Sequence, residues 1–464
     1  MRVLGAPAPP TGERGIYLGF GATGWAFSGP ERSTLVLGPS RSGKTSSVII
    51  PNVLAARGPV VSTSTKPDVL AATAPARREV GSTMLFDPSG TVESTPGVLR
   101  VGWSPVVSSD TWDGALSVGA AMVRSTRRGG SGSWTPASDD HWSERASSLI
   151  SPLLHAAALA DEPLRRVLSW IDRHDGSTPL RVLAERVGDD APATDVLAGL
   201  LATDEREQSG IWSTASGVFS AYRSQSALAS TEPPFLDAAA FAEGQDTLYI
   251  CSAGQQQQQL APLVVGILSD VRDATYRRAN AGRADPPVLF ALDEAANIAP
   301  LPDLPAIVSE GAGQGLLALV CLQDLSQARS RWGAEADGFL SLFGTTMVLG
   351  GIADQRTLES LSALAGDVEL ATRAVGLTRG ARGGRHASLT TSSVFRRRLP
   401  VDVAARGQPG AALALDARNR LGWVRHTPAH ATWPWRDLVA SRDRPVSPRE
   451  PSVGPGRDAP DLGR

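Results

Sequence analysis

The residues best suited to chemistry lie in one short stretch, Leu35–Thr45. Its apolar start, Leu35–Leu37, predicts a buried strand, and the pattern Gly-x-x-x-x-Gly-Lys-Thr follows directly. Glycines at both ends of such a loop let the backbone turn tightly around phosphate groups, with its amides directed inward. The next residues, Ser46–Ile50, predict the first turns of a helix whose positive end faces the same phosphates. The stretch is therefore typical of a loop that binds nucleoside triphosphates.

Two residues of this loop have expected chemical roles. We expect Lys44 to neutralise the β- and γ-phosphates of ATP during catalysis, and the Thr45 hydroxyl to bind Mg²⁺. Lys44 is one of only two lysines, the other being Lys66, although lysines and arginines together number 45. This usage indicates that lysine is kept where a compact charge on a flexible stem is needed. The residues predicted to bind ATP are Gly38, Pro39, Ser40, Arg41, Ser42, Gly43, Lys44, Thr45 and Ser46.

A second apolar run, Val288–Leu292, ends in the acids Asp293 and Glu294. Such a strand end is typical of a Walker B element, in which the first acid, here Asp293, holds Mg²⁺ through water. The second acid polarises the water that attacks ATP, so we expect Glu294 to be catalytic. Acids at a strand end also occur as simple helix caps, but the phosphate-binding loop favours the catalytic interpretation.

Gln323 follows a third apolar run, Leu316–Leu322. In P-loop sheets with an inserted strand, a polar residue at this point lies near the γ-phosphate as a sensor. We therefore count Gln323 among the candidate catalytic residues, and an ordinary loop glutamine is the alternative.

Positive charge is concentrated in residues 373–398, which hold seven arginines, several glycines and no acid. A flexible segment of this kind can follow the phosphate backbone of nucleic acid without reading its sequence. The residues predicted to contact DNA are Arg379, Arg382 and Arg385. A mobile, solvated loop is the alternative, and the triplet Arg396–Arg398 can instead pair with acids of the core.

The composition narrows the class of protein. The 464 residues have a net charge of −2, so any surface for a polyanion must be local. Cys251 and Cys321 lie inside apolar runs, as expected of core thiols in a reducing compartment. No run approaches the roughly 18 apolar residues of a membrane-spanning helix. The six histidines show no metal-ligand spacing, so we expect no structural metal.

Short apolar runs that alternate with helical patterns predict an α/β fold with a mostly parallel central sheet. Between 106 and 234 apolar residues recur at three- and four-residue steps, as in Leu149–Leu154, which predicts an inserted all-helical domain. The predicted divisions are a disordered N-terminus at 1–14, the first part of a P-loop core at 15–105, the helical domain at 106–234, the second part of the core at 235–428, and a largely disordered tail at 429–464.

The order of these motifs resembles the coupling-protein ATPases of type IV secretion and bacterial conjugation, the TraG/TraD group. The resemblance spans about 15–425, and the helical segment falls where that family has its all-alpha domain. The segments that carry it are GPSRSGKTSSVIIPNVL at 38–54, VVSTSTKPDVL at 60–70, MLFDP at 84–88, WSP at 103–105, LFALDEAANIAPLPDLP at 289–305, LVCLQDLSQARSRWG at 319–333, GIADQRTLESLSALAG at 351–366 and RRRLP at 396–400.

This resemblance implies a RecA/HerA-like P-loop motor that hydrolyses ATP with Mg²⁺ and assembles into a homo-hexameric ring. Such rings pump single-stranded DNA, or hand DNA–protein substrates, to a secretion channel. The implied partners are single-stranded DNA, relaxase and relaxosome proteins, and the proteins of the channel. The implied location is the cytoplasm, peripheral to the inner face of the cell membrane.

Two departures from the family pattern change this expectation. Family members usually begin with two membrane-spanning helices, whereas the phosphate-binding loop here starts at Gly38, so we expect a soluble form that reaches the membrane through a partner. Many members also carry an arginine, before the strand that ends in the glutamine, which acts on the ATP of the neighbouring subunit. The matching residues 309–315 hold no arginine, and Arg329, Arg331 or Arg356 could substitute for it.

Two rival functions stay open at this point. One is a related HerA/FtsK-like DNA pump outside secretion, although the match at 323–327 favours the coupling family. The other is a nucleotide-dependent docking platform with negligible turnover, which the missing arginine would explain.

Overall fold

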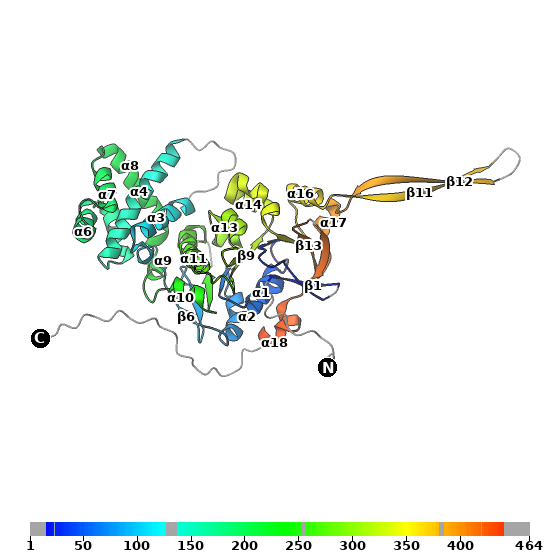
Figure 1. Cartoon of the computed structure of the whole chain (residues 1–464), viewed down its shortest axis with the longest axis horizontal. Helices are drawn as coiled ribbons and strands as arrows, with labels where there is room; N and C mark the ends of the chain where they lie inside the picture. Colours follow the sequence, from blue (N-terminus) through cyan, green and yellow to red (C-terminus); the bar gives the residue numbers. More distant parts are fainter. Residues whose placement is uncertain are drawn as a thin grey trace.

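Strands from both halves of the sequence form one sheet at the centre of the molecule (Figure 1). The computed structural model describes residues 15–22, 24–126, 137–252, 257–379, 385–418 and 420–439. The strands of this sheet are β1 (Tyr17–Gly21), β2 (Gly24–Phe27), β3 (Thr34–Leu37), β4 (Val60–Ser64), β5 (Thr83–Phe86), β6 (Leu99–Arg100), β7 (Thr247–Cys251), β8 (Val288–Leu292), β9 (Leu316–Leu322), β10 (Thr345–Val348), β13 (Ala411–Asp416) and β14 (Leu421–Arg425).

The strand order is β2-β1-β14-β13-β10-β3-β9-β8-β4-β7-β5-β6. Every pair from β10 to β6 is parallel, which confirms the predicted mostly parallel sheet. β3, β8 and β9 lie in the middle and are buried along their whole length. Continuous apolar runs are what strands covered on both faces require. The antiparallel strands β13, β14, β1 and β2 complete the edge beyond β10.

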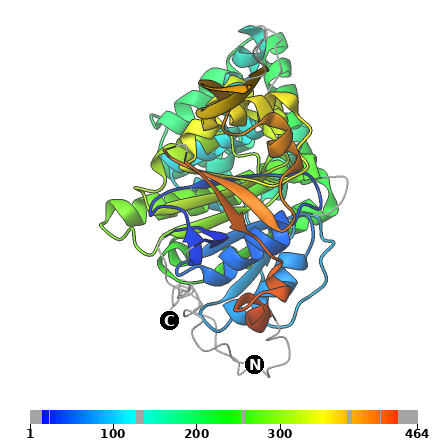
Figure 2. The same cartoon turned by 90° about the vertical axis from the view of Figure 1, so that its right-hand side faces the viewer.

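Helices cover both faces of the sheet, and the side chains of each strand alternate between two cores. Leu35 and Leu37 face one core, whereas Val36 faces the other. Cys251 and Cys321 are buried, free thiols of β7 and β9 on the face of Val36. The helices on that face are α1 (Ile50–Ala55), α2 (Asp68–Arg77) and α18 (Trp435–Val439), seen below the sheet in Figure 2. The helices on the opposite face include α11 (Gln257–Asn280), α12 (Ala295–Ile298), α13 (Leu304–Glu310), α14 (Leu325–Trp332), α16 (Gln355–Ala365) and α17 (Val401–Arg406).

Between β6 and β7 the described residues form helices and contain no strand. The long helix α4 (Ala137–Leu159) is the centre of this module and packs against five of the others (Figure 1). Its residues Leu149, Ile150, Leu153 and Leu154 are fully buried, as their spacing predicts. The remaining helices are α3 (Trp112–Thr126), α5 (Leu164–Arg173), α6 (Ser177–Val187), α7 (Pro192–Leu201), α8 (Glu205–Val218), α9 (Gln225–Ala229) and α10 (Ala238–Glu243).

The chain enters and leaves the helical module at one place. The backbone N–H of Gly102 donates to the Pro234 carbonyl at 2.8 Å, and the Gly102 carbonyl accepts from Leu236 N–H at 3.1 Å. The two connections therefore lie side by side at the edge of the sheet. The predicted domain boundaries at 106 and 234 fall close to this crossing and stay predictions.

The arginine-rich segment is a regular ribbon. Residues 367–397 form the antiparallel pair β11 (Asp367–Arg379) and β12 (Arg385–Arg397), which projects away from the sheet (Figure 1). The register pairs Leu370 with Val394 and Val375 with Leu389. Apolar and β-branched side chains that meet across two strands favour extended backbone, in spite of the glycines nearby. The prediction of a flexible segment was therefore wrong for the strand residues, and 380–384 lie outside the described residues.

The folded chain also continues past the predicted boundary at 428. A short turn, Ala429–Ala431, and α18 pack against the core, and the Trp435 side chain is fully buried. Its ring centroid lies 5.2 Å from that of Tyr17. The predicted, largely disordered tail at 429–464 thus includes folded residues at 429–439, and the segments 1–14 and 440–464 lie outside the described residues. Within the part of the chain that is described, every helix is too short or too polar to cross a bilayer.

Candidate nucleotide-binding site

Three neighbouring strands deliver the predicted site residues to one edge of the sheet. β3 leads into the loop at 38–45, β8 leads into Asp293 and Glu294, and β9 leads into Gln323. Because these strands are parallel and adjacent, the residues that follow them meet at their carboxyl ends. Ligands of open α/β sheets bind at this edge, so its side chains define the candidate site.

The loop at 38–45 can form only with glycine at its two ends. A Cβ at Gly38 would lie 2.8 Å from Ser42 Oγ and 3.0 Å from Leu349 Cβ. Gly43 has a φ of +94°, a backbone conformation that costs other residues free energy. The Gly38 N–H donates to the Leu322 carbonyl at 3.1 Å, which ties the loop to β9. The buried Ser42 hydroxyl has no hydrogen-bond partner, so it remains free to donate to a phosphate oxygen.

Lys44 is held against its own loop. Its Nζ donates to the carbonyls of Gly38 at 2.6 Å and Pro39 at 2.9 Å, and the side chain is only 5% exposed. The ammonium group therefore donates to neutral carbonyls of its own loop. The helix that starts at Thr45, a π-type turn over Thr45–Ile49 followed by α1, directs its free N–H groups at the same point. Both features make the loop a site for an anion.

Thr45 and Asp293 are in direct contact. The Thr45 hydroxyl donates to Asp293 Oδ2 at 2.5 Å, and the Thr63 hydroxyl donates to the Asp293 carbonyl at 3.1 Å. Burial raises the pKa of Asp293 to about 6, with Thr45 opposing the shift and the charge of Glu294 adding to it. A hydroxyl and a carboxylate placed together are oxygen ligands of the kind Mg²⁺ prefers. The residues therefore fit the metal role predicted for Thr45 and Asp293.

Glu294 has an unusual backbone. Its φ of 52° and ψ of 43° lie in the left-handed region, which costs a residue with a side chain roughly 1–2 kcal/mol. The backbone N–H donates to Asp293 Oδ1 at 3.1 Å, and Asn297 Nδ2 donates to Glu294 Oε2 at 3.3 Å. Such strain persists where the surrounding structure fixes it, and it is concentrated at functional sites.

Gln323 reaches the phosphate-binding loop from β9. Its Nε2 lies 3.5 Å from Ser40 Oγ, at the long end of hydrogen bonding, and its backbone N–H donates to Gln327 Oε1 at 2.9 Å. The structure thus brings Gln323, the loop and the acid pair together, as the sequence predicted. Their chemical roles stay predictions.

One residue beside the loop was not predicted from the sequence. His426 follows β14, and its Nδ1 lies 3.9 Å from the position that a Cβ on Gly43 would take. This nitrogen is buried without a hydrogen-bond partner, and burial lowers the pKa of the imidazole. β14 runs in the same direction as β3, with β13 and β10 between them, so its end lies at the same edge. Only the strand order marks this residue, and no local pattern does.

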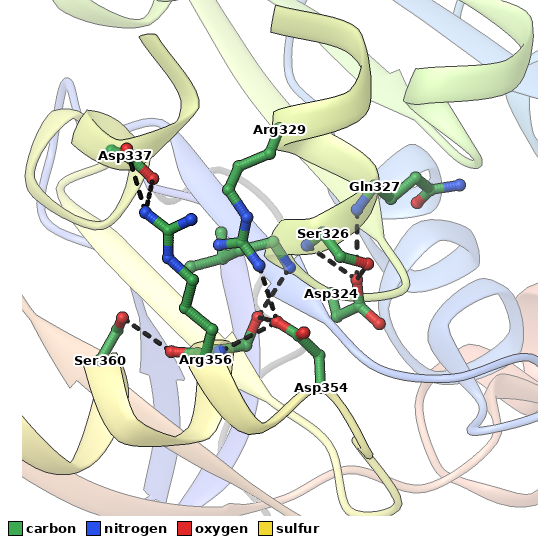
Figure 3. Close-up of polar contacts among 10 residues, drawn as sticks. Asp324, Ser326, Gln327, Arg329, Asp337, Asp354, Arg356 and Ser360 are labelled. Atoms are coloured by element: carbon green, nitrogen blue, oxygen red, sulfur yellow. Dashed lines mark hydrogen bonds and ion pairs between the residues drawn. The ribbon is translucent and has the colours of Figure 1, made fainter. Parts of the chain in front are cut away.

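The arginines considered as substitutes for the missing one have partners in the same chain (Figure 3). Arg329 on α14 pairs with Asp354 at 2.9 Å and is only 19% exposed, so it ties α14 to the start of α16. Arg356 on α16 is 63% exposed and pairs with Asp337 at 3.2 Å. Arg331 also has an interaction partner.

The residues predicted to contact DNA do not lie at this site. Arg379 and Arg385 are paired in the backbone register at the outer end of the ribbon, far from the phosphate-binding loop (Figure 1). Arg382 lies outside the described residues. Arg397, near the base of the ribbon, pairs with Asp367 of β11 at 3.4 Å, and pairing of the triplet Arg396–Arg398 with acids of the core stays a prediction.

The fold and the site geometry agree with comparisons to known proteins. The chain belongs to the type IV secretory system conjugative DNA transfer family, whose model matches residues 7–394. The predicted resemblance to coupling proteins is thereby confirmed. A comparison with curated proteins finds no significant match.

Solved structures of a coupling protein share the fold. The unbound monoclinic form of the bacterial conjugative coupling protein TrwBdeltaN70 is 17% identical, with a TM-score of 0.65 over 86% of this chain and 85% of that chain. Plasmid coupling protein TrwB in complex with the GTP analogue GDPNP is also 17% identical, with a TM-score of 0.63 over 86% of each chain. Its complex with ADP and Mg²⁺ gives 17% identity and a TM-score of 0.62 over the same shares.

Proposed function

We propose that the chain is an ATP-hydrolysing coupling protein that recruits single-stranded DNA, or a DNA–protein substrate, and translocates it to a conjugation or type IV secretion channel. The observation that carries the proposal is the contact between Thr45 and Asp293, which joins the phosphate-binding loop to the acid pair. Glu294 stands beside this contact in a strained backbone, which binding alone would not require. Membership of the conjugative DNA transfer family supplies the DNA context.

Each residue of the site has a role in this proposal. Lys44 and the amides of the loop bind the β- and γ-phosphates, and Thr45 and Asp293 hold Mg²⁺. When bound, Mg²⁺ neutralises charge that develops on the phosphate oxygens. Glu294 orients and polarises the attacking water, and Gln323 responds to the γ-phosphate from the neighbouring strand. The TrwB complexes with GDPNP and with ADP and Mg²⁺ support this choice of ligands.

The partners follow from the same proposal. The arginines 379, 382 and 385 contact the phosphate backbone of single-stranded DNA, without reading its sequence. Copies of the chain assemble into a homo-hexameric ring, and relaxase, relaxosome and channel proteins deliver and receive the substrate. The chain works at the inner face of the cell membrane and is held there by a partner.

A second candidate function is a nucleotide-dependent docking platform with negligible turnover. One observation favours it: residues 309–315 hold no arginine to act on a neighbour's ATP. Arg329 and Arg356 are already engaged with acids of their own chain. A ring of such chains would bind ATP and present a surface without cycling.

The test is ATP turnover by the full chain, with and without single-stranded DNA. We expect turnover that needs Mg²⁺ and rises with DNA. Lys44→Ala removes the charge that neutralises phosphate, so nucleotide binding should be lost. Glu294→Gln keeps its shape but loses the carboxylate, so it should bind ATP and turn it over at least about 100-fold more slowly.

Exposed Glu79 offers a matched control, because Glu79→Gln makes the same chemical change away from the site. Turnover by Glu294→Gln at the wild-type rate would contradict the assignment of the acid pair. ATP binding without turnover in the wild-type chain, even with DNA, would favour the docking platform.

A further inference from the structure

The ribbon β11–β12 exposes apolar side chains on both of its faces. Val375 and Leu389 form one cross-strand pair and are 63% and 64% exposed. Phe395 lies on the same face, since its partner Glu369 is six residues from Val375, and it is 69% exposed. Leu370 and Val394 form a pair on the opposite face and are 43% and 42% exposed. The ribbon is therefore apolar on two sides and covered on neither.

A ribbon of this kind needs a partner. Two strands alone are marginally stable in water, and stability requires a third strand or a packed face. The chain itself holds only the base, through the Arg397–Asp367 pair, the Arg398 N–H bond to the Gly366 carbonyl and a contact with α16. The paired strands of 13 residues extend about 40 Å beyond that base. Exposed apolar side chains on both faces indicate a protein partner, since a phosphate backbone offers charged and polar atoms and no apolar surface.

A groove of matching character lies in the helical half of the molecule. It runs between α3 and α11, with a volume of about 600 Å³, and α10 contributes to one wall. Val107 and Phe235, which are 48% and 37% exposed, provide its apolar surface. Four aspartates line it against a single arginine: Asp110, Asp237, Asp270 and Asp273 against Arg277. Asp270 is already hydrogen-bonded within the groove, because its Oδ2 accepts from Trp103 Nε1 at 2.6 Å and from the Ser108 hydroxyl. Asp110 and Asp237 are exposed.

We propose that the ribbon of one copy of this chain docks into the α3–α11 groove of a second copy. The charges are complementary, because the groove is acidic and the ribbon, apart from the arginines 379, 382 and 385 assigned to DNA, still holds three arginines against two acids. Both surfaces also offer exposed apolar side chains that need cover. A ribbon cannot reach the groove of its own chain, since the two lie at opposite ends of the molecule (Figure 1).

This contact joins two different surfaces, so it is heterologous. Each copy that gives its ribbon to one neighbour still offers its groove to another, and the contact repeats until a ring closes. The inference rests on the proposed assembly of several copies, but it depends neither on ATP turnover nor on DNA binding.

The first experiment measures the mass of the full chain in solution over a range of concentrations. The ribbon variant carries Val375→Thr, Leu389→Thr and Phe395→Ser, and the groove variant carries Asp110→Arg and Ser117→Trp at two exposed lining positions. We expect each variant to self-associate about tenfold more weakly or worse than the wild type. Val187→Thr is the matched control, because Val187 on α6 is 41% exposed and belongs to neither surface.

Mixing the two variants gives the sharper test. The ribbon variant keeps an intact groove and the groove variant keeps an intact ribbon, so one good contact remains between unlike chains. We expect a one-to-one dimer that does not grow further, while each variant alone stays monomeric. Unchanged thermal midpoints of both variants show that they are folded.

Three outcomes would overturn the proposal. One is a wild-type chain that stays monomeric at all concentrations, and another is a mixture that forms no dimer. The third is a ribbon variant of unchanged mass but weaker single-stranded DNA binding, which would make the shaft of the ribbon a DNA surface. Loss of turnover in Glu294→Gln with normal assembly leaves the proposal standing, so the two proposals fail separately.

Discussion

Asp293 and Glu294 are neighbours in the sequence but have different environments. Asp293 is buried against Thr45, and burial raises its pKa to about 6, whereas Glu294 is half-buried on a left-handed backbone. A pair of acids with separate environments can divide two tasks, one at a metal and one at water. The backbone strain at Glu294 can be measured.

The strain at Glu294 predicts an inverted order of stability between two variants. Glycine adopts a φ of 52° freely, whereas alanine does not, so Glu294→Gly should be about 1 kcal/mol more stable than Glu294→Ala. In ordinary helical backbone the order is the reverse. Urea titration of both variants measures the difference, and both should have lost ATP turnover. A more stable alanine variant would show that the backbone relaxes at this position.

His426 gives a second prediction at this scale. The ring packs beside Gly43, and its buried Nδ1 has no partner. We expect His426→Ala to weaken ATP binding, because the loop loses its support on the β14 side, while the rate of turnover at saturating ATP changes little. His430→Ala is the control, since His430 is exposed and lies four residues further on. Equal ATP affinity in both variants would contradict a role for His426.

The difference between these residues shows what sequence can predict. The loop at 38–45 and the acid pair each lie at the end of an apolar strand, so a short stretch of sequence is enough to recognise each of them. His426 comes near Gly43 because β14 and β3 belong to the same sheet, in the order β14-β13-β10-β3. Strand order depends on contacts between distant parts of the chain, and local periodicity does not encode it.

At the scale of elements, the helical module is joined to the sheet by two adjacent connections. We expect a chain in which a short Gly-Ser linker replaces residues 106–234 to bind ATP with nearly the wild-type affinity. Its thermal midpoint should fall, because Val118 and Met122 of α3 share one continuous core with α11. Calorimetry and nucleotide titration measure both effects. Loss of nucleotide binding in a folded variant would show that the module shapes the site.

The end of the ribbon is the element for which DNA binding was predicted. Changing Arg379, Arg382 and Arg385 to Ala should weaken single-stranded DNA binding, and the log–log salt slope should fall by roughly 0.7 for each lost phosphate contact. Thermal stability should hardly change. Arg397→Ala is the control, because its exposed pair with Asp367 is expected to contribute less than about 1 kcal/mol. An unchanged salt slope in the triple variant would show that these arginines do not contact DNA and are ordinary solvated surface residues.

The ribbon itself could not be predicted from the sequence. Glycine and arginine supply seven of the thirteen residues at 376–388, and so glycine-rich a composition is typical of loops. The strands form because distant partners such as Leu370 and Val394 meet in register, and that pairing is visible only in the structure. The buried strands β8 and β9 were predictable, because a continuous apolar run needs no partner to be recognised.

At the scale of the whole molecule, the proposed function predicts where the chain is found. In cells that contain its secretion partners, we expect the chain in the membrane fraction. Without them, we expect it in the cytosolic fraction, because the proposed function assigns membrane attachment to a partner. Cell fractionation with and without the channel proteins measures this shift. An unchanged cytosolic distribution with all partners present would count against the coupling role.

Both cysteine thiols are buried, so we expect them to be unreactive in the folded chain. Cys251 and Cys321 are at most 2% exposed, and burial raises the pKa of Cys251 to about 12. Thiolate is the reactive form, so neither residue should react with a maleimide in the folded chain. A single cysteine placed on the ribbon, for example Leu389→Cys, would then be the sole site of labelling. Fluorescent or spin labels could thus report distances between copies without any change to the core.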